Sequence, residues 1–289
     1  MDLERLLQID RRTWNGHTHT EFCPHGSGED VELFIQRAID AGFKTYTITE
    51  HFPMAPEFYT HVTGAEHAIT TACMAPEDLP TYFEKLATLK AKYADQITLL
   101  TGFEFDYLKI GREYTATALA QYADQIDDAI LSVHFLPTKM GLRAVDDSCA
   151  DFKAGVLAEY KTPLGVAKAY LKTIKEALEW QVANKPGRIG HITLYRKWRN
   201  EFPNETIWCD AETDALITAI LRLVKEQGIM LDCNMSGIPR ETQTESSPTF
   251  DIIRDALMLG IPMVYGSDAH AVVAVNQGYN VYLDQKMYL

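Results

Sequence analysis

Residues 30–52 read DVELFIQRAIDAGFKTYTITEHF and join a helical pattern to a strand-like pattern. The apolar side chains of the first half share one helical face: Val31, Phe34, Ile35, Ala38 and Ile39. Gly42 follows this stripe, and glycine commonly stands where a helix ends. The second half is a short β-branched and apolar run that ends in polar residues, the last of them His51. The segment therefore predicts a helix followed by a buried strand.

The same two patterns recur along the whole chain. Further helical stripes occupy residues 78–93, 169–180 and 214–228. Strand-like runs occupy seven segments: 14–19, 44–52, 97–107, 128–135, 188–194, 228–237 and 261–270. Strands that alternate with helices favour a parallel sheet, and barrels of about 250 residues routinely form one domain. We therefore predict an α/β fold in which residues 1–289 form a single-domain (β/α)7 barrel with parallel strands; a doubly wound open sheet is the alternative.

Two long segments lack either pattern. Residues 60–74 and 141–163 are predicted as the longest loops of the chain. Long loops within a compact domain often cover a functional site. We therefore expect these two segments to lie over the site.

The charge and hydropathy of the chain limit its partners. Twenty-seven basic residues stand against 40 acidic ones, which gives a formal charge of −13. Such a charge repels a nucleic-acid backbone, so we expect no nucleic-acid partner. The sequence also contains no apolar run of about 18 to 20 residues and starts without a secretion signal, which predicts a cytoplasmic protein without a membrane-spanning segment. The oligomeric state is left open by these features.

The cysteines argue against two kinds of site. There are five, an odd number, and they are widely spaced without a Cys-x-x-Cys pair. Disulfide frameworks and thiolate zinc sites use paired or closely spaced cysteines. We therefore predict reduced thiols without a role in metal binding.

Ligand-type residues cluster at the carboxyl ends of the predicted strands. In order along the chain they are His17, His19, His51, Glu104, His134, His191, Asp268 and His270, with His25 in the turn after the first strand. The carboxyl ends of the strands of a parallel barrel surround one common mouth. We therefore expect these nine side chains to converge, with Asn234 and Ser236 beside them. His61 and His67 lie in a predicted loop and are expected to be surface or lid residues.

Imidazoles and carboxylates are typical ligands of zinc, iron and manganese. Nine such groups exceed the needs of one ion, and leaving the others buried and unpaired would be costly. The number of groups favours two or three ions, with Glu104 as the candidate bridging carboxylate. Clusters of this kind activate water and stabilise both oxygens of a displacement, so the pattern indicates hydrolysis.

At this point the motifs resemble a known family. The segments NGHTHT, ITEHF, GFEFDY, LSVHF, GHITL and YGSDAH are similar, in order, to those of the polymerase and histidinol phosphatase (PHP) superfamily. RIGHITLYRKW and YGSDAH resemble its histidinol-phosphate phosphatase branch most. The resemblance implies a distorted seven-stranded barrel, a centre of three divalent transition-metal ions (zinc, manganese, iron or cobalt) and hydrolysis of L-histidinol phosphate in histidine biosynthesis through a metal-bound hydroxide.

The resemblance also implies how the ligands are shared. It assigns His17, His19, Glu104 and Asp268 to a first ion. It assigns Glu104, His134 and His191 to a second ion, and His25, His51 and His270 to a third. We predict catalytic roles for Glu104, Asp268 and His270.

The substrate expected from these features is a small phosphomonoester. Arg196 and Arg240 follow two predicted strands, on loops that leave the expected mouth. An arginine side chain binds phosphate through directional, paired hydrogen bonds. We therefore predict that both bind substrate.

Three alternatives compete with this interpretation. An amidohydrolase-like enzyme also places His-x-His on its first strand and Asp on its last, but often bridges its metals with a modified lysine, where this chain has Glu104. Some PHP domains serve polymerases as exonucleases, which the acidic charge disfavours. A metal-storing role is the weakest alternative, because structural sites use few ligands and are closed.

Overall fold

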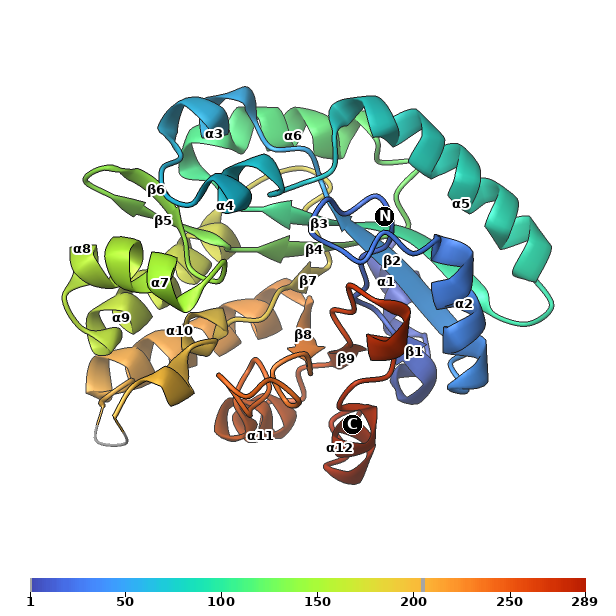
Figure 1. Cartoon of the computed structure of the whole chain (residues 1–289). Coiled ribbons are helices and arrows are strands. Elements are labelled where there is room, and N and C mark those ends of the chain that lie inside the picture. The colour runs from blue at the N-terminus through green and yellow to red at the C-terminus, as the bar shows by residue number, and fades with distance from the viewer. Residues whose placement is uncertain (1, 204–205) are drawn as a thin grey trace.

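The computed structural model describes residues 2–203 and 206–289. Seven parallel strands close into a barrel in the order β1-β2-β3-β4-β7-β8-β9 (Figure 1). Their bounds are β1 Trp14–Asn15, β2 Thr45–His51, β3 Thr98–Asp106, β4 Asp128–Ser132, β7 Arg188–Ile189, β8 Met230–Asn234 and β9 Met263–Gly266. The pairing of Asn15 with Tyr265 joins the first strand to the last. The predicted parallel barrel is confirmed, and the open sheet is wrong.

The barrel is uneven around its circumference. β2 and β3 pair over seven residues, whereas β1 and β7 are only two residues long. Beyond β1 the chain stays extended, because Thr18 forms an isolated bridge with Ala269. The distortion expected from the family resemblance is therefore concentrated at these two short strands.

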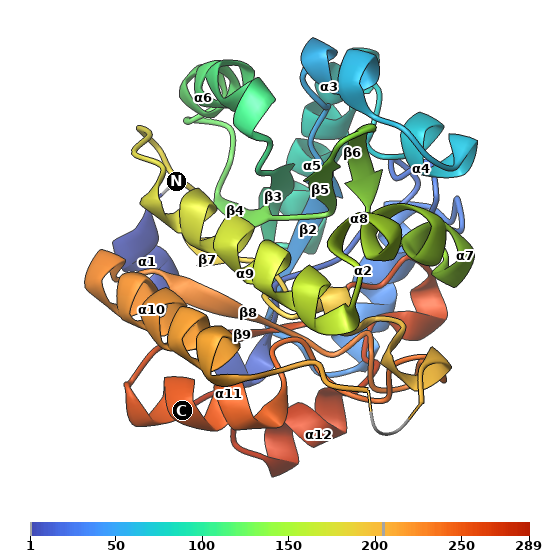
Figure 2. The ribbon, with the colours of Figure 1, turned by 90° about the vertical axis from the view of Figure 1, so that its left-hand side faces the viewer.

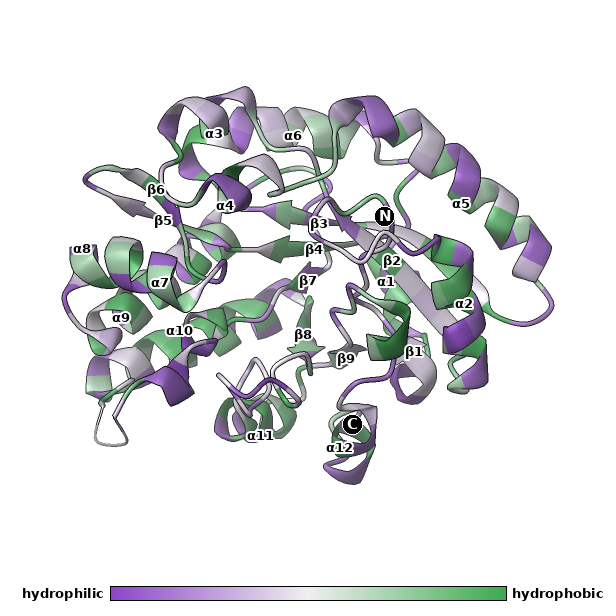
Figure 3. Cartoon of the chain, in the orientation of Figure 1, coloured by the Kyte–Doolittle hydropathy of each residue, from purple (hydrophilic) through white to green (hydrophobic). Residues whose placement is uncertain are grey.

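Helices pack around the outside of the barrel (Figures 1 and 2). They are α1 Leu3–Leu7, α2 Val31–Asp40, α5 Leu79–Tyr93, α6 Arg112–Gln121, α9 Pro163–Glu179, α10 Ala211–Gln227, α11 Phe250–Met258 and α12 Tyr279–Asp284. Figure 3 shows green, apolar and purple, polar positions on the same outer helices, as expected for helices with one buried face. No helix among the described residues is long and apolar enough to cross a membrane.

All four predicted helices are present, and two of them, α9 and α10, begin earlier than predicted. α9 begins six residues before the predicted stripe, because Thr162 caps it and Pro163 occupies its first position. α10 begins at Ala211, where Asp210 and Thr213 form a capping box. It ends at Gln227 and is capped by Gly228, whose φ of 65° is the left-handed conformation that favours glycine.

The two segments predicted as long loops contain regular structure, so that prediction is wrong. Residues 60–74 include the end of α3 Pro56–His61 and α4 Glu66–Thr70. Residues 141–163 include β6 Gly141–Ala144, which pairs antiparallel with β5 Phe135–Thr138, and the short helices α7 Cys149–Phe152 and α8 Ala158–Tyr160. The physical reason is a second, small apolar cluster that these segments bury together, made of Met54, Phe58, Ala68, Cys73, Leu108, Phe135 and Ala144. These helices and strands are too short to show a periodic pattern in the sequence, and contacts with this shared core stabilise them.

Candidate metal centre

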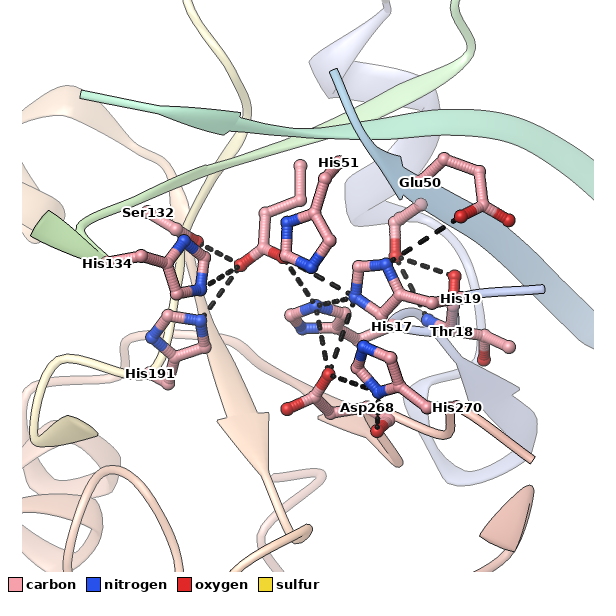
Figure 4. Close-up of polar contacts among 12 residues, drawn as sticks. His17, Thr18, His19, Glu50, His51, Ser132, His134, His191, Asp268 and His270 are labelled. Carbon is pink, nitrogen blue, oxygen red and sulfur yellow. Dashed lines mark hydrogen bonds and ion pairs between the residues drawn. The ribbon is translucent and has the colours of Figure 1, made fainter. Parts of the chain in front are cut away.

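The nine predicted ligands come together at one end of the barrel, and each has a ligand atom within 3.7 Å of another member. Figure 4 labels seven of them: His17, His19, His51, His134, His191, Asp268 and His270. Glu104 lies within β3 and His51 ends β2, while the other seven follow β1, β4, β7 and β9. Two backbone hydrogen bonds hold the segments after β1 and β9 side by side. His19 N donates to Ala269 O, and Asp268 N donates to His17 O. The convergence expected at the strand ends is therefore present.

Glu104 occupies the middle of the group. Its Oε1 lies 2.8 Å from His191 Nε2 and 3.6 Å from His134 Nε2, and it accepts a hydrogen bond from Ser132 Oγ. Its Oε2 lies 3.2 to 3.4 Å from nitrogens on the opposite side, those of His17, His19 and His51. The two oxygens therefore face different sets of histidines, which is the geometry of a carboxylate between two cations.

The ligand atoms fall into groups that resemble the expected sharing. His17, His19 and Glu104 form one close group, with Asp268 Oδ1 3.4 Å from His19 Nε2. Glu104, His134 and His191 form a second group. His51 and His270 form a third with His19 and Cys23, and His25 Nε2 lies 3.0 Å from His270 Nε2. Cys23 was not expected near a metal centre.

Hydrogen bonds on the far ring nitrogens orient several of the histidines. His17 Nδ1 lies 2.9 Å from Asp232 Oδ2, His134 Nδ1 lies 3.0 Å from Asp106 Oδ1, and His25 Nδ1 lies 2.8 Å from Thr71 O. An oxygen acceptor at Nδ1 keeps the hydrogen there and leaves the lone pair on Nε2. The Nε2 atoms of these three rings therefore point into the group, where each could bind a metal ion after losing any proton.

Asp106 and Asp232 were missed by the sequence analysis. Asp106 stands two residues after Glu104 on β3, and alternate residues of a strand share a face. Asp232 stands two residues before Asn234 on β8 in the same way. This two-residue spacing from a polar strand end was the available signal.

Asp268 is held in an unusual backbone conformation. Its φ is 49°, a left-handed value that is uncommon for residues other than glycine. Its Oδ2 accepts hydrogen bonds from Asn234 Nδ2 and Ser236 Oγ, each at 3.2 Å, while Oδ1 faces His17 and His19. Asn234 and Ser236 therefore support this carboxylate from behind.

Burial and charge shift the pKa values of the group in opposite directions. Burial disfavours a charged His17, but the surrounding carboxylates outweigh it and hold the pKa of that ring well above its usual value. Burial likewise opposes a charged His134, yet Asp106 and Glu104 raise its pKa to about 10. In contrast, burial and His19 lower the pKa of His270 to about 3. The pKa values of Glu104 and Asp268 lie well below usual, because neighbouring histidines outweigh their burial.

The donor set fits bound cations. Glu104 Oε2 and His51 Nδ1 are buried without a hydrogen-bond partner among the described residues. Two pairs of Nε2 atoms also face each other, 3.1 Å apart for His17 and His19 and 3.0 Å apart for His25 and His270. Buried polar atoms are normally paired, and metal ions between these atoms would satisfy them.

A cavity of about 310 Å³ opens above the group. Its charged and polar lining outside the predicted ligands consists of His67, Thr71, Asp146, Asp147, Lys197 and Arg240. Its apolar lining consists of Ala68, Ala72, Phe135, Ala144 and Leu194. Part of this wall comes from the segments 60–74 and 141–163, so these cover the site as expected although they are not plain loops.

The two predicted substrate arginines lie in different places. Arg240 lines the cavity, whereas Arg196 is not among the described residues that line it. Arg196 instead binds Glu245, with Nε 2.5 Å from Oε1 and Nη2 3.2 Å from Oε2. The next residue, Lys197, lines the cavity and lies 3.2 Å from Asp146 Oδ2. Substrate binding by Arg196 stays a prediction, and its geometry does not favour it.

The two histidines left outside the metal centre also differ. His61 is exposed, and its Nδ1 lies 2.8 Å from Glu57 O. His67 lines the cavity, and its Nδ1 lies 3.0 Å from Asp147 Oδ1. The His67 side chain is 67% exposed and that of Asp147 11%, so this pair lies at the opening.

The PHP domain model matches residues 15–236. This range contains seven of the nine predicted ligands and, in full or in part, six of the seven strands. The chain belongs to the PHP family. Its membership confirms the resemblance expected from the strand-end motifs. Among curated PHP relatives, the histidinol-phosphatase of Bacillus subtilis is 32% identical over 273 residues, 94% of this chain and 98% of the relative. A probable histidinol-phosphatase of Deinococcus radiodurans is 28% identical over 89% of this chain and 85% of its own length.

Two solved structures extend the comparison. A putative histidinol phosphatase from Listeria monocytogenes has a TM-score of 0.91 and 40% identity, covering 93% of this PHP chain and 99% of its own. The histidinol phosphate phosphatase of Lactococcus lactis, solved with zinc, L-histidinol and phosphate, has a TM-score of 0.66 and 19% identity over 95% and 94% of the two chains. The second likeness concerns the fold alone.

Proposed function

We propose that this PHP protein hydrolyses L-histidinol phosphate to L-histidinol and phosphate, and that residues 1–289 form its single catalytic domain. The observation that carries the proposal is the position of Glu104 between two sets of histidines, some of which line a cavity that also has acidic and basic side chains. Full-length similarity to the histidinol-phosphatase of Bacillus subtilis supports the choice of substrate.

The nine converging side chains are proposed to hold three divalent ions, zinc, manganese, iron or cobalt. His17, His19, Glu104 and Asp268 would hold one ion. Glu104, His134 and His191 would hold the second ion, and His25, His51 and His270 the third. When bound, such ions neutralise a phosphate dianion and make water a better nucleophile near neutral pH.

Asp268 and His270 are proposed to act in their proton-free forms. The pKa of Asp268 lies well below its usual value and that of His270 is about 3, so neither side chain holds a proton near pH 7. Asn234 and Ser236 fix one oxygen of Asp268 and leave the other directed at the centre. Both residues therefore serve as electron-pair donors at the open side of the group, where Asp268 is 18% and His270 29% exposed.

The basic side chains of the cavity, Arg240 and Lys197, which form its basic wall, are proposed to bind the phosphate group of the substrate. Arg240 and Lys197 line the cavity together with the predicted ligands His191 and Asp268. Arginine supplies paired hydrogen bonds to phosphate oxygens, and lysine supplies a compact positive charge. Lys197 replaces Arg196 as the preferred second cation, because Lys197 lines the cavity and the described lining does not include Arg196.

The acidic wall is proposed to bind the ammonium end. Asp147 is paired with His67 at the opening, and a substrate ammonium would take the place of this exposed ring. Asp146 remains charged because Lys197 and nearby histidines outweigh its burial and hold its pKa below the usual value. Apolar side chains such as Phe135 and Leu194 then offer a surface for the imidazole ring of the substrate.

A substrate comparison tests the proposal. Phosphate release would be measured from L-histidinol phosphate and from an aryl phosphate, alongside an amide and lactone panel and single-stranded DNA. We expect a substantially higher kcat/KM for L-histidinol phosphate than for the aryl phosphate. Equal rates on unrelated monoesters would overturn the substrate. Turnover confined to amides or lactones would favour an amidohydrolase-like enzyme, and turnover confined to DNA would favour a nuclease.

A further inference from the structure

A fully buried arginine lies inside the barrel beneath the candidate metal centre. Arg188, on β7, directs Nε and Nη2 to the carboxylate of Asp128, with distances of 3.2 Å to Oδ1 and 2.5 Å to Oδ2. Nη2 also donates to Gly16 O at 2.6 Å. The side chains of Arg188 and Asp128 are 0% exposed. One edge of the guanidinium is therefore fully occupied by these two acceptors.

The other edge of the guanidinium faces Asp232. Arg188 Nη1 lies 3.9 Å from Asp232 Oδ1, and neither atom has a hydrogen-bond partner among the described residues. Both side chains are 0% exposed, so these opposite charges face each other away from bulk water. The second oxygen of Asp232, Oδ2, accepts the Nδ1 hydrogen of His17 at 2.9 Å. Asp128, Arg188, Asp232 and His17 thus form a continuous buried series.

Two glycines leave the space that this series needs. A Cβ at Gly16 would lie 2.6 Å from Arg188 Nη1, and a Cβ at Gly266 would lie 2.3 Å from Asp232 Oδ1. Side-chain carbons do not approach other atoms so closely without displacing them. The strand ends of β1 and β9 are therefore shaped around the guanidinium and the carboxylate.

We infer that Arg188 is a positioning residue of the metal centre, which holds Asp232 in place so that His17 keeps its hydrogen on Nδ1 and directs Nε2 into the candidate centre, where it would hold a metal ion. The inference rests on the proposed function, because it takes His17 as a metal ligand. A carboxylate behind a ligating histidine fixes its ring and strengthens its donor atom. An arginine remains charged when buried, so it stabilises Asp232 as an anion.

Charge explains why the series needs the arginine. Without Arg188, the interior would hold Asp128 and Asp232 as two buried carboxylates without a cation between them. Removing one partner of a buried ion pair leaves an uncompensated charge, which is strongly unfavourable. Asp232 would then lose the group that holds it in place, and the hydrogen bond that orients His17 would weaken.

The test measures zinc binding rather than turnover. Chelator-treated protein would be titrated with zinc in competition with a chromophoric chelator, for the wild type and for Arg188→Met, Arg188→Lys and Asp232→Asn. We expect Arg188→Met and Asp232→Asn each to weaken the binding of one ion by about 10- to 100-fold, the range for residues behind a metal ligand. The double variant Arg188→Met/Asp232→Asn should bind zinc no more weakly than whichever of the two single variants has the lower zinc affinity, because both changes interrupt the same series of buried contacts.

Two controls separate positioning from general stability. Arg143→Met breaks another arginine–aspartate pair, Arg143 Nη2 with Asp151 Oδ1 at 2.7 Å, which is largely but not fully buried and lies outside the candidate centre. It should leave zinc affinity unchanged, and an equal loss would overturn the inference. Far-UV circular dichroism of each chelator-treated variant identifies those that fold. If Arg188→Met does not fold, Arg188→Lys and Asp232→Asn still decide, since unchanged zinc affinity in both overturns the inference.

His17→Ala distinguishes this inference from the function on which it rests. Loss of one ion in His17→Ala, with unchanged affinity in the Arg188 and Asp232 variants, would reject only the positioning role. Unchanged metal content in His17→Ala itself would reject His17 as a ligand, and the proposed metal centre with it.

Discussion

His25 Nε2 lies 3.0 Å from His270 Nε2, although 245 positions separate the two residues in the chain. Each ring directs its Nδ1 toward a backbone oxygen, that of Thr71 for His25 and that of Asp268 for His270. Both Nε2 atoms then carry lone pairs, which repel each other at this distance. A cation bound by both rings removes that repulsion.

This relationship leads to a prediction of metal content. Protein purified without chelator should contain two to three transition-metal ions per chain, because the nine converging side chains exceed the needs of one ion. Elemental analysis by mass spectrometry would measure the content. His61→Ala is the matched control and should keep the metal content of the wild type, since His61 is exposed and its Nδ1 contacts Glu57 O. One ion or none in active protein would contradict the prediction.

Glu104→Gln should reduce kcat/KM by more than about 100-fold, the upper range for residues that only orient a metal ligand. The reason is that its two oxygens face different sets of histidines, so the change affects two ion positions together. Steady-state kinetics and metal analysis would be compared with Asp151→Asn, a buried carboxylate paired with Arg143. Near wild-type activity with normal metal content in Glu104→Gln would exclude the bridging role.

The sequence predicted the barrel because its strands are short runs rich in β-branched and apolar residues that alternate with helical stripes. β2, for example, reads TYTITEH, and the structure buries all seven of its residues. The helix α4 was missed, because its five residues form no recognisable stripe and are stabilised by contacts with residues distant in sequence such as Phe135. Long-range contacts of this kind leave no local periodicity.

The sequence predicted the site residues that lie at strand ends, because the order of the strands fixes their positions. It could not predict which loop residues reach the site, because that depends on the direction of each side chain. Glu104 and Asp268 were found because strand ends of a parallel barrel meet. Arg196 and Lys197 are neighbours on one loop, yet Arg196 turns to Glu245 and Lys197 to the cavity. Sequence position alone does not distinguish these two directions.

The raised pKa of His134 predicts how pH affects the metal-free protein. Burial opposes the charged ring, but Asp106 and Glu104 raise its pKa to about 10, against about 6.5 in an unfolded chain. Between these values the folded state binds more protons, so stability falls as pH rises. The contribution is complete below about pH 6.5 and is lost as pH passes about 10. The melting temperature of chelator-treated protein should therefore fall over this window.

Zinc should reverse this dependence, because a metal ion on His134 must displace the proton. Zinc binding at pH 7.5 should release protons and tighten as pH rises. Calorimetry in two buffers of different ionisation enthalpy measures the protons released. His134→Gln serves as the comparison and should release fewer protons; equal release would show that His134 is neutral before metal binds.

The basic wall of the cavity gives a prediction for phosphate binding. Arg240→Ala and Lys197→Ala should each lower kcat/KM for histidinol phosphate. We expect the loss of transition-state stabilisation to be about 1.5 to 3 kcal/mol, the usual range for a hydrogen bond to a charged group. Arg196→Ala was expected from sequence to have the same effect, but its pairing with Glu245 now favours a smaller one. Steady-state kinetics on all three variants would rank them. Unchanged kinetics in Arg240→Ala and Lys197→Ala would reject the phosphate-binding role.

The acidic wall gives a prediction about substrate choice. Asp147→Asn should raise KM for L-histidinol phosphate but leave an aryl phosphate unaffected, because only the first substrate carries an ammonium to pair with this carboxylate. His67→Ala should act in the opposite direction and lower KM for L-histidinol phosphate, since it removes the group now 3.0 Å from Asp147 Oδ1. Metal content should stay constant in both variants, because neither residue is among the predicted ligands. The decisive quantity is the ratio of the two kcat/KM values in each variant. If Asp147→Asn lowers kcat/KM equally for both substrates, Asp147 supports the shape of the opening and does not recognise the ammonium.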